Sequence, residues 1–157
     1  MRTIDISQVS TAPEIALCAD IWLQASILAH DFIAPDFWRN NRNAMKEHYL
    51  PASTIYAAKK QAVIVGFAAV YQDSLAALFV SPEWWNKGIG SKLLRHAQMA
   101  HSKLSLNVYT KNSGAIRFYQ KYGFSVLNEQ ICSHTGEPEL RMGWRKKEDE
   151  NCKFRAG

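Results

Sequence analysis

Residues 78–94, LFVSPEWWNKGIGSKLL, determine how the rest of the chain is interpreted. They predict a buried strand that runs through a glycine-containing turn directly into an amphipathic helix. The first N–H groups of a helix have no partner within the helix and lie at the positive end of its dipole, so they bind phosphate groups well. Gly88 and Gly90 would let the backbone approach phosphate oxygens without a Cβ in the way.

Positive charge gathers around the same turn, since Lys87, Lys92 and Arg95 lie within it or just after it. Two longer phosphate-binding patterns are absent: no Gly-Lys-Ser/Thr follows a distant glycine, and Gly90 is not followed by a third glycine at the required spacing. Their absence argues against nucleoside triphosphate and dinucleotide sites. A Gly-x-Gly pair also occurs in ordinary strand-to-helix turns, so the turn alone leaves a purely structural interpretation open.

The whole chain has 157 residues, of which 47% are apolar and 21% charged. This predicts one folded domain that buries about two-thirds of its unfolded surface, and it excludes disordered, collagen-like and disulfide-dense classes. The longest apolar run, residues 62–71, falls well short of the roughly 18 residues that a membrane-spanning helix needs. The first ten residues contain Asp5 and lack the apolar core of a signal peptide. We therefore expect no membrane partner.

The cysteines, Cys18, Cys132 and Cys152, have neither metal-site nor Cys-x-x-Cys spacing, which predicts a reduced cytoplasmic protein without a metal site. The net charge of +5 favours an anionic partner without naming one. A nucleic-acid-binding domain would need cations on one face with exposed aromatic residues. The cations here are scattered and dense only at residues 87–95, so the pattern disfavours a nucleic-acid partner. Residues 145–157, RKKEDENCKFRAG, are interpreted as a charged, flexible tail, which leaves a domain at 1–144.

Local patterns give the order of secondary structure. Thr11, Pro13 and Glu14 supply the cap, first-turn proline and acid that begin a helix, and Gly123 is typical of the residue that ends one. Expected strands cover residues 2–7, 53–59, 62–71, 74–80, 104–110, 124–132 and 139–144; expected helices cover 11–30, 35–50, 90–101 and 113–122. The order β-α-α-β-β-β-α-β-α-β-β predicts a mixed α/β sheet with helices on its faces.

The stretch NSGAIRFYQKYGF at residues 112–124 follows an expected strand and ends at a glycine. Together with the glycine turn it resembles the GNAT superfamily of N-acetyltransferases, in particular its small bacterial single-domain members. The family's patterns are Arg/Gln-x-x-Gly-x-Gly and Asn-x-x-Ala-x-x-Phe/Leu-Tyr-x-x-x-Gly-Phe. The second is matched at every position, by Asn112, Ala115, Phe118, Tyr119, Gly123 and Phe124. In the first, Trp85 stands at the Arg/Gln position, so we expect Lys87 and backbone amides to supply more of the phosphate contacts.

The resemblance implies a mostly antiparallel sheet of six or seven strands, splayed between the fourth and fifth, with about four helices. It also implies direct transfer of acetyl from acetyl-CoA to an amine, with no metal. The cosubstrate would lie in the splay and contact Leu78, Phe79, Val80, Lys87, Gly88, Ile89, Gly90, Ser91, Lys92 and Asn112.

The resemblance gives Tyr119 the role of general acid that protonates the CoA thiolate; the alternative is an aromatic anchor between helix and sheet. Glu83, just beyond the fourth strand, is a candidate base or water relay, or a solvated turn residue. His30, between the first two helices, is a second candidate base, or a structural histidine.

The acceptor groove should lie between the first two helices and the last strands, where Phe32, Phe37, Trp38, Trp84 and Tyr71 would make it aromatic. The acceptor is a peptide or protein amine, at lysine or the N-terminus, or a small-molecule amine. Two other functions stay open: an acetyl-CoA-binding sensor without turnover, and the nucleic-acid-binding domain. The protein is expected to be a monomer, or a homodimer through an exposed strand edge near the C-terminus.

Overall fold

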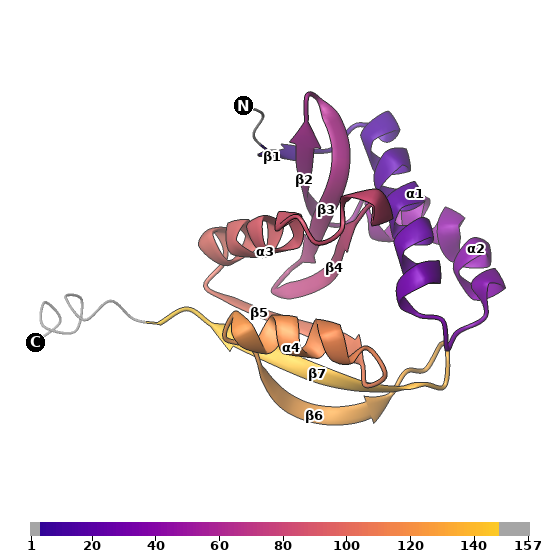
Figure 1. Cartoon of the computed structure of the whole chain (residues 1–157), viewed down its shortest axis with the longest axis vertical. Coiled ribbons are helices and arrows are strands. Elements are labelled where there is room, and N and C mark those ends of the chain that lie inside the picture. Colours follow the sequence, from indigo (N-terminus) through magenta and orange to yellow (C-terminus); the bar gives the residue numbers. More distant parts are fainter. Residues whose placement is uncertain (1–3, 148–157) are drawn as a thin grey trace, which may run out of the picture.

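The structure, a computed structural model, describes residues 4–147, and within them seven strands form one sheet in the order β1-β2-β3-β4-β5-β7-β6 (Figure 1). The strands are β1 (Asp5–Val9), β2 (Thr54–Lys60), β3 (Val63–Tyr71), β4 (Ser74–Val80), β5 (Lys103–Tyr109), β6 (Ser125–Ile131) and β7 (Pro138–Arg145). The α-helices are α1 (Ala12–Ala29), α2 (Pro35–Ala44), α3 (Ile89–Ala100) and α4 (Ser113–Lys121). The predicted element order and mixed α/β fold are confirmed.

The sheet is antiparallel except between β4 and β5, which run parallel and separate almost at once. Their one paired position is Ser74 with Ser105, beside a hydrogen bond of 2.9 Å from the Ser105 N–H to the Asp73 carbonyl. Beyond this point the two strands diverge, so β1–β4 and β5–β7 form two halves (Figure 1). The predicted splay between the fourth and fifth strands is confirmed.

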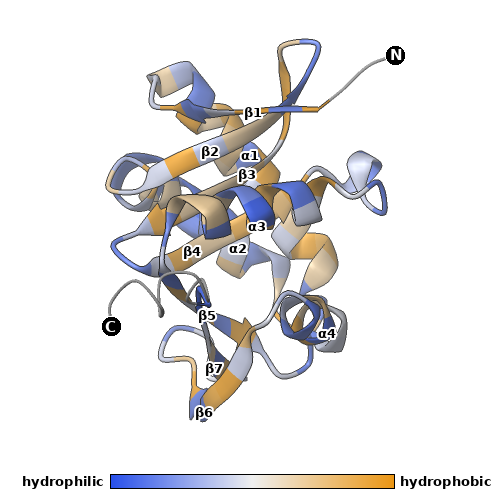
Figure 2. Cartoon of the chain, turned by 90° about the vertical axis from the view of Figure 1, so that its left-hand side faces the viewer, coloured by the Kyte–Doolittle hydropathy of each residue, from blue (hydrophilic) through white to orange (hydrophobic). Residues whose placement is uncertain are grey.

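Helices cover both faces of the first half. α1 and α2 pack on one face, against buried residues of β2 and β3 such as Ile55 and Phe67. α3 packs on the opposite face through Ile89, Leu93 and Leu94, and hydrophilic residues occupy the side of α3 turned to the viewer in Figure 2. α4 covers β5 and β7 on the same face as α3. Alternate residues of β2, β3 and β4 therefore contribute to two separate cores, one on each face of the sheet.

By length and mean hydropathy alone, α1 could cross a membrane, since its 18 residues have a mean hydropathy of 1.3. In the fold it is a core helix that contacts β3 and β4 and buries Ile15, Cys18, Ile21 and Trp22.

The predicted caps are present. Thr11 Oγ1 accepts the Glu14 N–H, and the Glu14 carboxylate accepts the Thr11 N–H at 3.1 Å, so the two residues form a reciprocal box at the start of α1. Gly123 follows α4 with φ of +95°, the left-handed conformation expected of a terminating glycine. The second helix departs from prediction, because α2 ends at Ala44 and a π-helical turn (Met45–Tyr49) completes the segment.

The edge of the sheet at β6 is exposed. β6 is the edge strand, and its Val126, Leu127 and Ile131 side chains are exposed, so the expected strand edge near the C-terminus is present. Arg145, predicted to lie in the tail, belongs to β7 and pairs with Lys103. The rest of the predicted tail from residue 148 onward, together with residues 2 and 3 of the first predicted strand, lies outside the described residues.

Candidate active site

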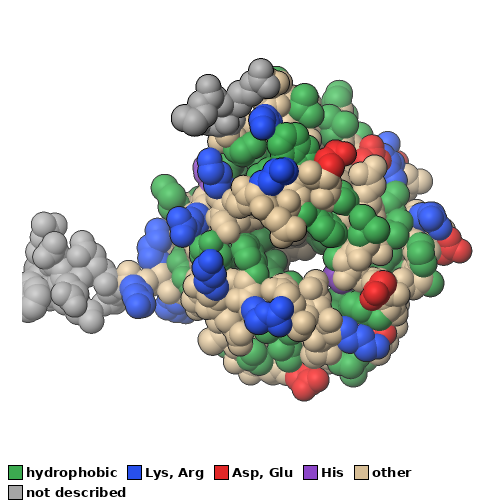
Figure 3. All heavy atoms as spheres, in the orientation of Figure 1, with side chains coloured by type: hydrophobic (Ala, Val, Ile, Leu, Met, Phe, Trp, Pro, Cys, Tyr) green, Lys and Arg blue, Asp and Glu red, His purple; other side chains and the backbone are tan. Residues whose placement is uncertain are grey.

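A cavity of about 750 Å³ lies where β4 and β5 separate. Its lining comes from β4, the following turn, the first residues of α3, β5 and α4, together with the end of α1. Figure 3 shows a hollow in the middle of the molecule, between α3 and α4. Two halves that share one paired position thus enclose a space large enough for an extended ligand.

One end of the cavity is the predicted phosphate turn. Gly88 precedes α3 with φ of +79°, a conformation that strains other residues, and no side chain caps the helix. The first helical hydrogen bond runs from the Lys92 N–H to the Gly88 carbonyl, so the N–H groups of Ile89, Gly90 and Ser91 precede the helix's own bonding pattern. These amides, which lie at the cavity wall, can bind an anion.

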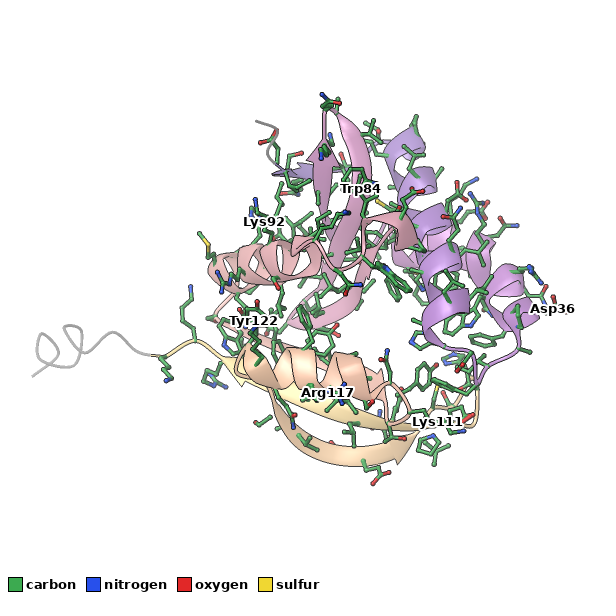
Figure 4. All side chains as sticks on the ribbon, viewed as in Figure 1. Asp36, Trp84, Lys92, Lys111, Arg117 and Tyr122 are labelled. Carbon is green, nitrogen blue, oxygen red and sulfur yellow. The ribbon has the colours of Figure 1, made fainter. Side chains whose placement is uncertain are left out.

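The cations predicted for this turn surround it rather than line it. Lys87, Lys92 and Arg95 are exposed, and none of the three is part of the cavity wall. Lys92 projects from α3 into solvent in Figure 4. All the remaining predicted cosubstrate residues line the cavity: Leu78, Phe79, Val80, Gly88, Ile89, Gly90, Ser91 and Asn112.

Trp85 connects the turn to the end of β4. Its indole Nε1–H donates a hydrogen bond of 2.7 Å to the Val80 carbonyl oxygen. Trp85 and Val80 both line the cavity. The residue that replaces the usual arginine or glutamine therefore fastens the turn to the strand through an N–H donor.

Asn112 and Tyr119 bring α4 to the cavity wall. Asn112 is the N-cap of α4, and its Oδ1 accepts the Ala115 N–H at 3.2 Å, while its NH₂ group is available to donate to a ligand. Tyr119 is half-buried against the rings of Phe118 and Phe124. Its removal from water raises the pKa of the Tyr119 phenol, which stays protonated at neutral pH, as a proton donor must. Its catalytic role stays a prediction.

His30 lies at the other end of the cavity, buried between α1 and α2. Its ring stacks on Trp38 with centroids 5.1 Å apart and meets Tyr109 edge-on at 5.2 Å. Burial lowers the pKa of His30 to about 4, and its Nδ1 is buried without a hydrogen-bond partner. The imidazole is therefore uncharged at neutral pH and a weak base, and the role predicted for it stays a prediction.

The other predicted side chains divide between wall and surface. Trp38 and Trp84 line the cavity, and Phe32 and Phe37 pack behind the wall, against His30 and Trp38 respectively. Tyr71 is half-exposed at the end of β3 and does not line it. Glu83 is exposed on the single 3₁₀ turn after β4 (Pro82–Trp84) and likewise lies outside the lining.

Sequence reasoning missed Glu139, at the start of β7. Its carboxylate is the only one among the described residues that line the cavity, and no described lysine or arginine lines it. Glu139 is the register partner of Tyr109 on β5. Alternation along 138–145 separates Glu139 and Arg141 from Leu140 and Met142, but only the pairing with β5 shows which set faces the cavity. Among residues 4–147 no group of three or more His, Cys, Asp or Glu is placed to hold a metal ion.

The family described as "Acetyltransferase (GNAT) domain" matches residues 51–126, which run from β2 into β6 and include the glycine turn and α4. The chain is 31% identical over 132 residues to the peptidyl-lysine N-acetyltransferase YiaC of Escherichia coli K12, covering 83% of this chain and 90% of that protein. It is 30% identical over 119 residues to the peptidyl-lysine N-acetyltransferase YjaB of Salmonella typhimurium LT2, covering 75% and 81% respectively.

The fold has a solved counterpart. The solution structure of apo-form YjaB from Escherichia coli superposes with a TM-score of 0.79, at 24% identity, over 92% of this chain and 99% of that one. The splayed sheet and its helices are therefore shared with a known acetyltransferase structure.

Proposed function

This chain belongs to the GNAT family of acetyltransferases, and we propose that it transfers the acetyl group of acetyl-CoA directly to the ε-amine of a lysine in a peptide or protein. One observation carries the proposal: a single cavity joins the uncapped start of α3 to an aromatic end that holds one carboxylate. The first feature suits a pyrophosphate and the second a cationic amine. The relatives named peptidyl-lysine N-acetyltransferases support the choice of lysine.

The described residues fit acetyl-CoA. Leu78, Phe79 and Val80 line the cavity beside the splay, where their backbone would pair with the pantetheine arm. The amides of residues 89–91 suit the pyrophosphate, and Lys87, Lys92 and Arg95 surround it with positive charge. Acetyl-CoA supplies the acetyl group as a thioester, from which the CoA thiolate leaves readily.

The chain's residues then serve acyl transfer. A lysine amine has a pKa near 10.4 and must lose one proton to solvent water before its nitrogen bonds to the acetyl carbon. The nitrogen loses a second proton as the amide forms, which replaces through water the proton that Tyr119 gives to the thiolate. The oxygen that gains charge in this attack can be stabilised by a backbone N–H of β4. As the carbon–sulfur bond breaks, the Tyr119 hydroxyl would donate its proton to the thiolate, and its raised pKa keeps that proton available.

The lining also bears on the acceptor. Because Glu139 is the one charged side chain among the described lining residues, the acceptor end favours a positively charged ligand. Cytoplasmic location is part of the same proposal: Cys18 and Cys132 are free thiols, as expected of a reducing compartment.

The test is thiol release from acetyl-CoA with a panel of amines. The panel contains a peptide with one lysine and a blocked N-terminus, the same peptide with that lysine replaced by alanine, and a polyamine. We expect release with the lysine peptide and none with the alanine peptide. Calorimetric binding of acetyl-CoA without release on any amine would instead support a sensor, and absence of binding would contradict the proposal.

A further inference from the structure

Building on the proposed function, we propose that Glu139 is a specificity-determining residue that selects an unbranched alkylammonium group at the acceptor end of the cavity. The subsite consists of Glu139, Tyr109, His30 and Trp38, and is called the acceptor subsite below. It would recognise a lysine side chain by its charge and its straight hydrocarbon stem.

The sheet itself places Glu139 at the cavity. Tyr109 on β5 and Glu139 on β7 are opposite each other in an antiparallel pair, so their side chains leave the same face. Val108 and Leu140, one position along each strand, pack on the other face under α4. The His30 and Tyr109 ring centroids are 5.2 Å apart, and the His30 ring also stacks on Trp38. A series of neighbouring side chains therefore extends from Glu139 on β7 through Tyr109 to the end of α1 and to α2.

The Glu139 carboxylate is held but not neutralised. Its Oε1 accepts a hydrogen bond of 2.9 Å from the Gln130 amide on β6, which leaves Oε2 for a ligand. Glu139 forms no ion pair with any residue between 4 and 147. The Gln130 amide carries no net charge, so the carboxylate stays without a cationic partner among the described residues and can pair with an incoming cation.

Neighbouring cations are directed elsewhere. Lys111, labelled in Figure 4, pairs with Glu137 at 3.1 Å and lies over the Phe32 ring. Arg141, two positions along β7, is exposed and lines a separate groove with Asp73 and Lys103. The acceptor subsite therefore keeps one uncompensated negative charge among the described residues.

The rest of the wall suits an alkyl stem. Trp22, Ala25 and Ala29 present apolar surface from α1, and the two alanines leave room for a straight chain. The ring of Tyr109, which lines the cavity, can attract an ammonium group. The low pKa of His30 keeps its ring uncharged at neutral pH, so it does not repel a cation. A branched or bulky amine would lose the apolar contacts along α1.

This role differs from proton abstraction. A carboxylate that pairs with an ammonium group stabilises the charged form of the amine, which cannot attack. Glu139 would therefore strengthen the capture of the acceptor, and its removal should raise KM for the lysine peptide rather than lower kcat.

The experiment compares Glu139→Gln with the wild type. Glutamine keeps the size of the side chain and can still accept the hydrogen bond from Gln130. We expect KM for a lysine peptide to rise about tenfold, with kcat and KM for acetyl-CoA unchanged. Methoxyamine, which is uncharged at neutral pH, should react equally with both proteins. Glu129→Gln, at an exposed position of β6 outside the cavity lining, is the matched control and should leave KM unchanged.

Three results would overturn the inference: an unchanged KM in Glu139→Gln, an equal loss with methoxyamine, or a fall in kcat alone. If the wild type acetylates no amine, the proposed function fails separately. Calorimetric binding of Nα-acetyl-lysine methylamide to the CoA-loaded protein then decides the matter. Weaker binding to Glu139→Gln than to wild type would support the subsite, and equal binding would refute it.

Discussion

The hydroxyl of Tyr122 donates a hydrogen bond to Oγ of Ser91 at 2.7 Å, which joins the end of α4 to the first turn of α3 (Figure 4). α3 packs on the β2–β4 half of the sheet and α4 on the β5–β7 half, so this bond connects the two halves beside the cavity. Because Ser91 Oγ accepts from Tyr122, its own proton is free to donate to a ligand at the phosphate turn.

Replacing Tyr122 by phenylalanine should therefore weaken the cosubstrate site without touching the chemistry. The loss of one hydrogen bond costs about 1 kcal/mol, so we expect KM for acetyl-CoA to rise about fivefold while kcat stays close to wild type. Steady-state kinetics at saturating acceptor measure this. Tyr49→Phe, on an exposed tyrosine remote from the cavity, is the control. A Tyr122→Phe enzyme with unaltered KM would show that the bond does not order the turn.

Trp85→Phe removes the indole donor to the Val80 carbonyl and keeps an aromatic ring. With the turn no longer fastened to β4, acetyl-CoA should bind about fivefold more weakly in calorimetry. Trp85→Arg offers an N–H donor and a positive charge, and should recover the affinity. If Trp85→Phe bound acetyl-CoA as tightly as wild type, the tie between turn and strand would have no role in binding.

Tyr119→Phe removes the proton donor proposed for the leaving thiolate. General acid catalysis of this kind contributes about a hundredfold or more, so kcat should fall by about that factor while calorimetric affinity for acetyl-CoA is kept. The fall in kcat should be largest at low to neutral pH, where CoA leaves as the protonated thiol. Turnover that is the same as wild type at every pH would leave Tyr119 only its packing against Phe124.

His30 should make stability depend on pH. Its pKa falls from 6.5 in the unfolded chain to about 4 in the folded protein, because burial disfavours the charged ring. Between these values the unfolded state binds a proton that the folded state does not, so stability is fully present above 6.5 and decreases as pH falls toward 4. The decrease amounts to about 3 kcal/mol.

Urea unfolding at pH values above and within this window measures the effect. His30→Phe, which keeps a ring on Trp38, should lose most of the dependence, whereas His48→Gln on an exposed position should retain it. A His30→Phe protein with the same pH dependence as wild type would assign the acid sensitivity to other groups.

Local chemistry made much of the fold predictable. Thr11 and Glu14 form the expected box because both partners lie within one turn, and Gly123 adopts the left-handed conformation that follows from the end of α4. The conformation of the glycine turn likewise depends on neighbouring residues, so the sequence predicts that residues 88–91 lie at the cavity.

Features that depend on distant contacts were not predictable in the same way. Glu83 lies three positions after the end of β4, which lines the cavity, yet it is exposed, because the 3₁₀ turn directs it outward. Glu139 has no local signal, and only its register with Tyr109 brings it to the acceptor end. The predicted second helix continues to residue 50, whereas α2 ends at Ala44. Residues 45–49 contain no proline or glycine that would indicate the change to a π-helical turn.

We propose that the protein acetylates the ε-amine of lysine. Tandem mass spectrometry tests this most directly, because it locates the acetyl group on the peptide. The substrate is a peptide with a free N-terminus and one internal lysine, incubated with acetyl-CoA and the full chain. We expect a single acetyl group on the lysine side chain, formed only when the protein is present. An acetyl group on the N-terminal amine alone, or none on the peptide while acetyl-CoA is bound, would contradict it.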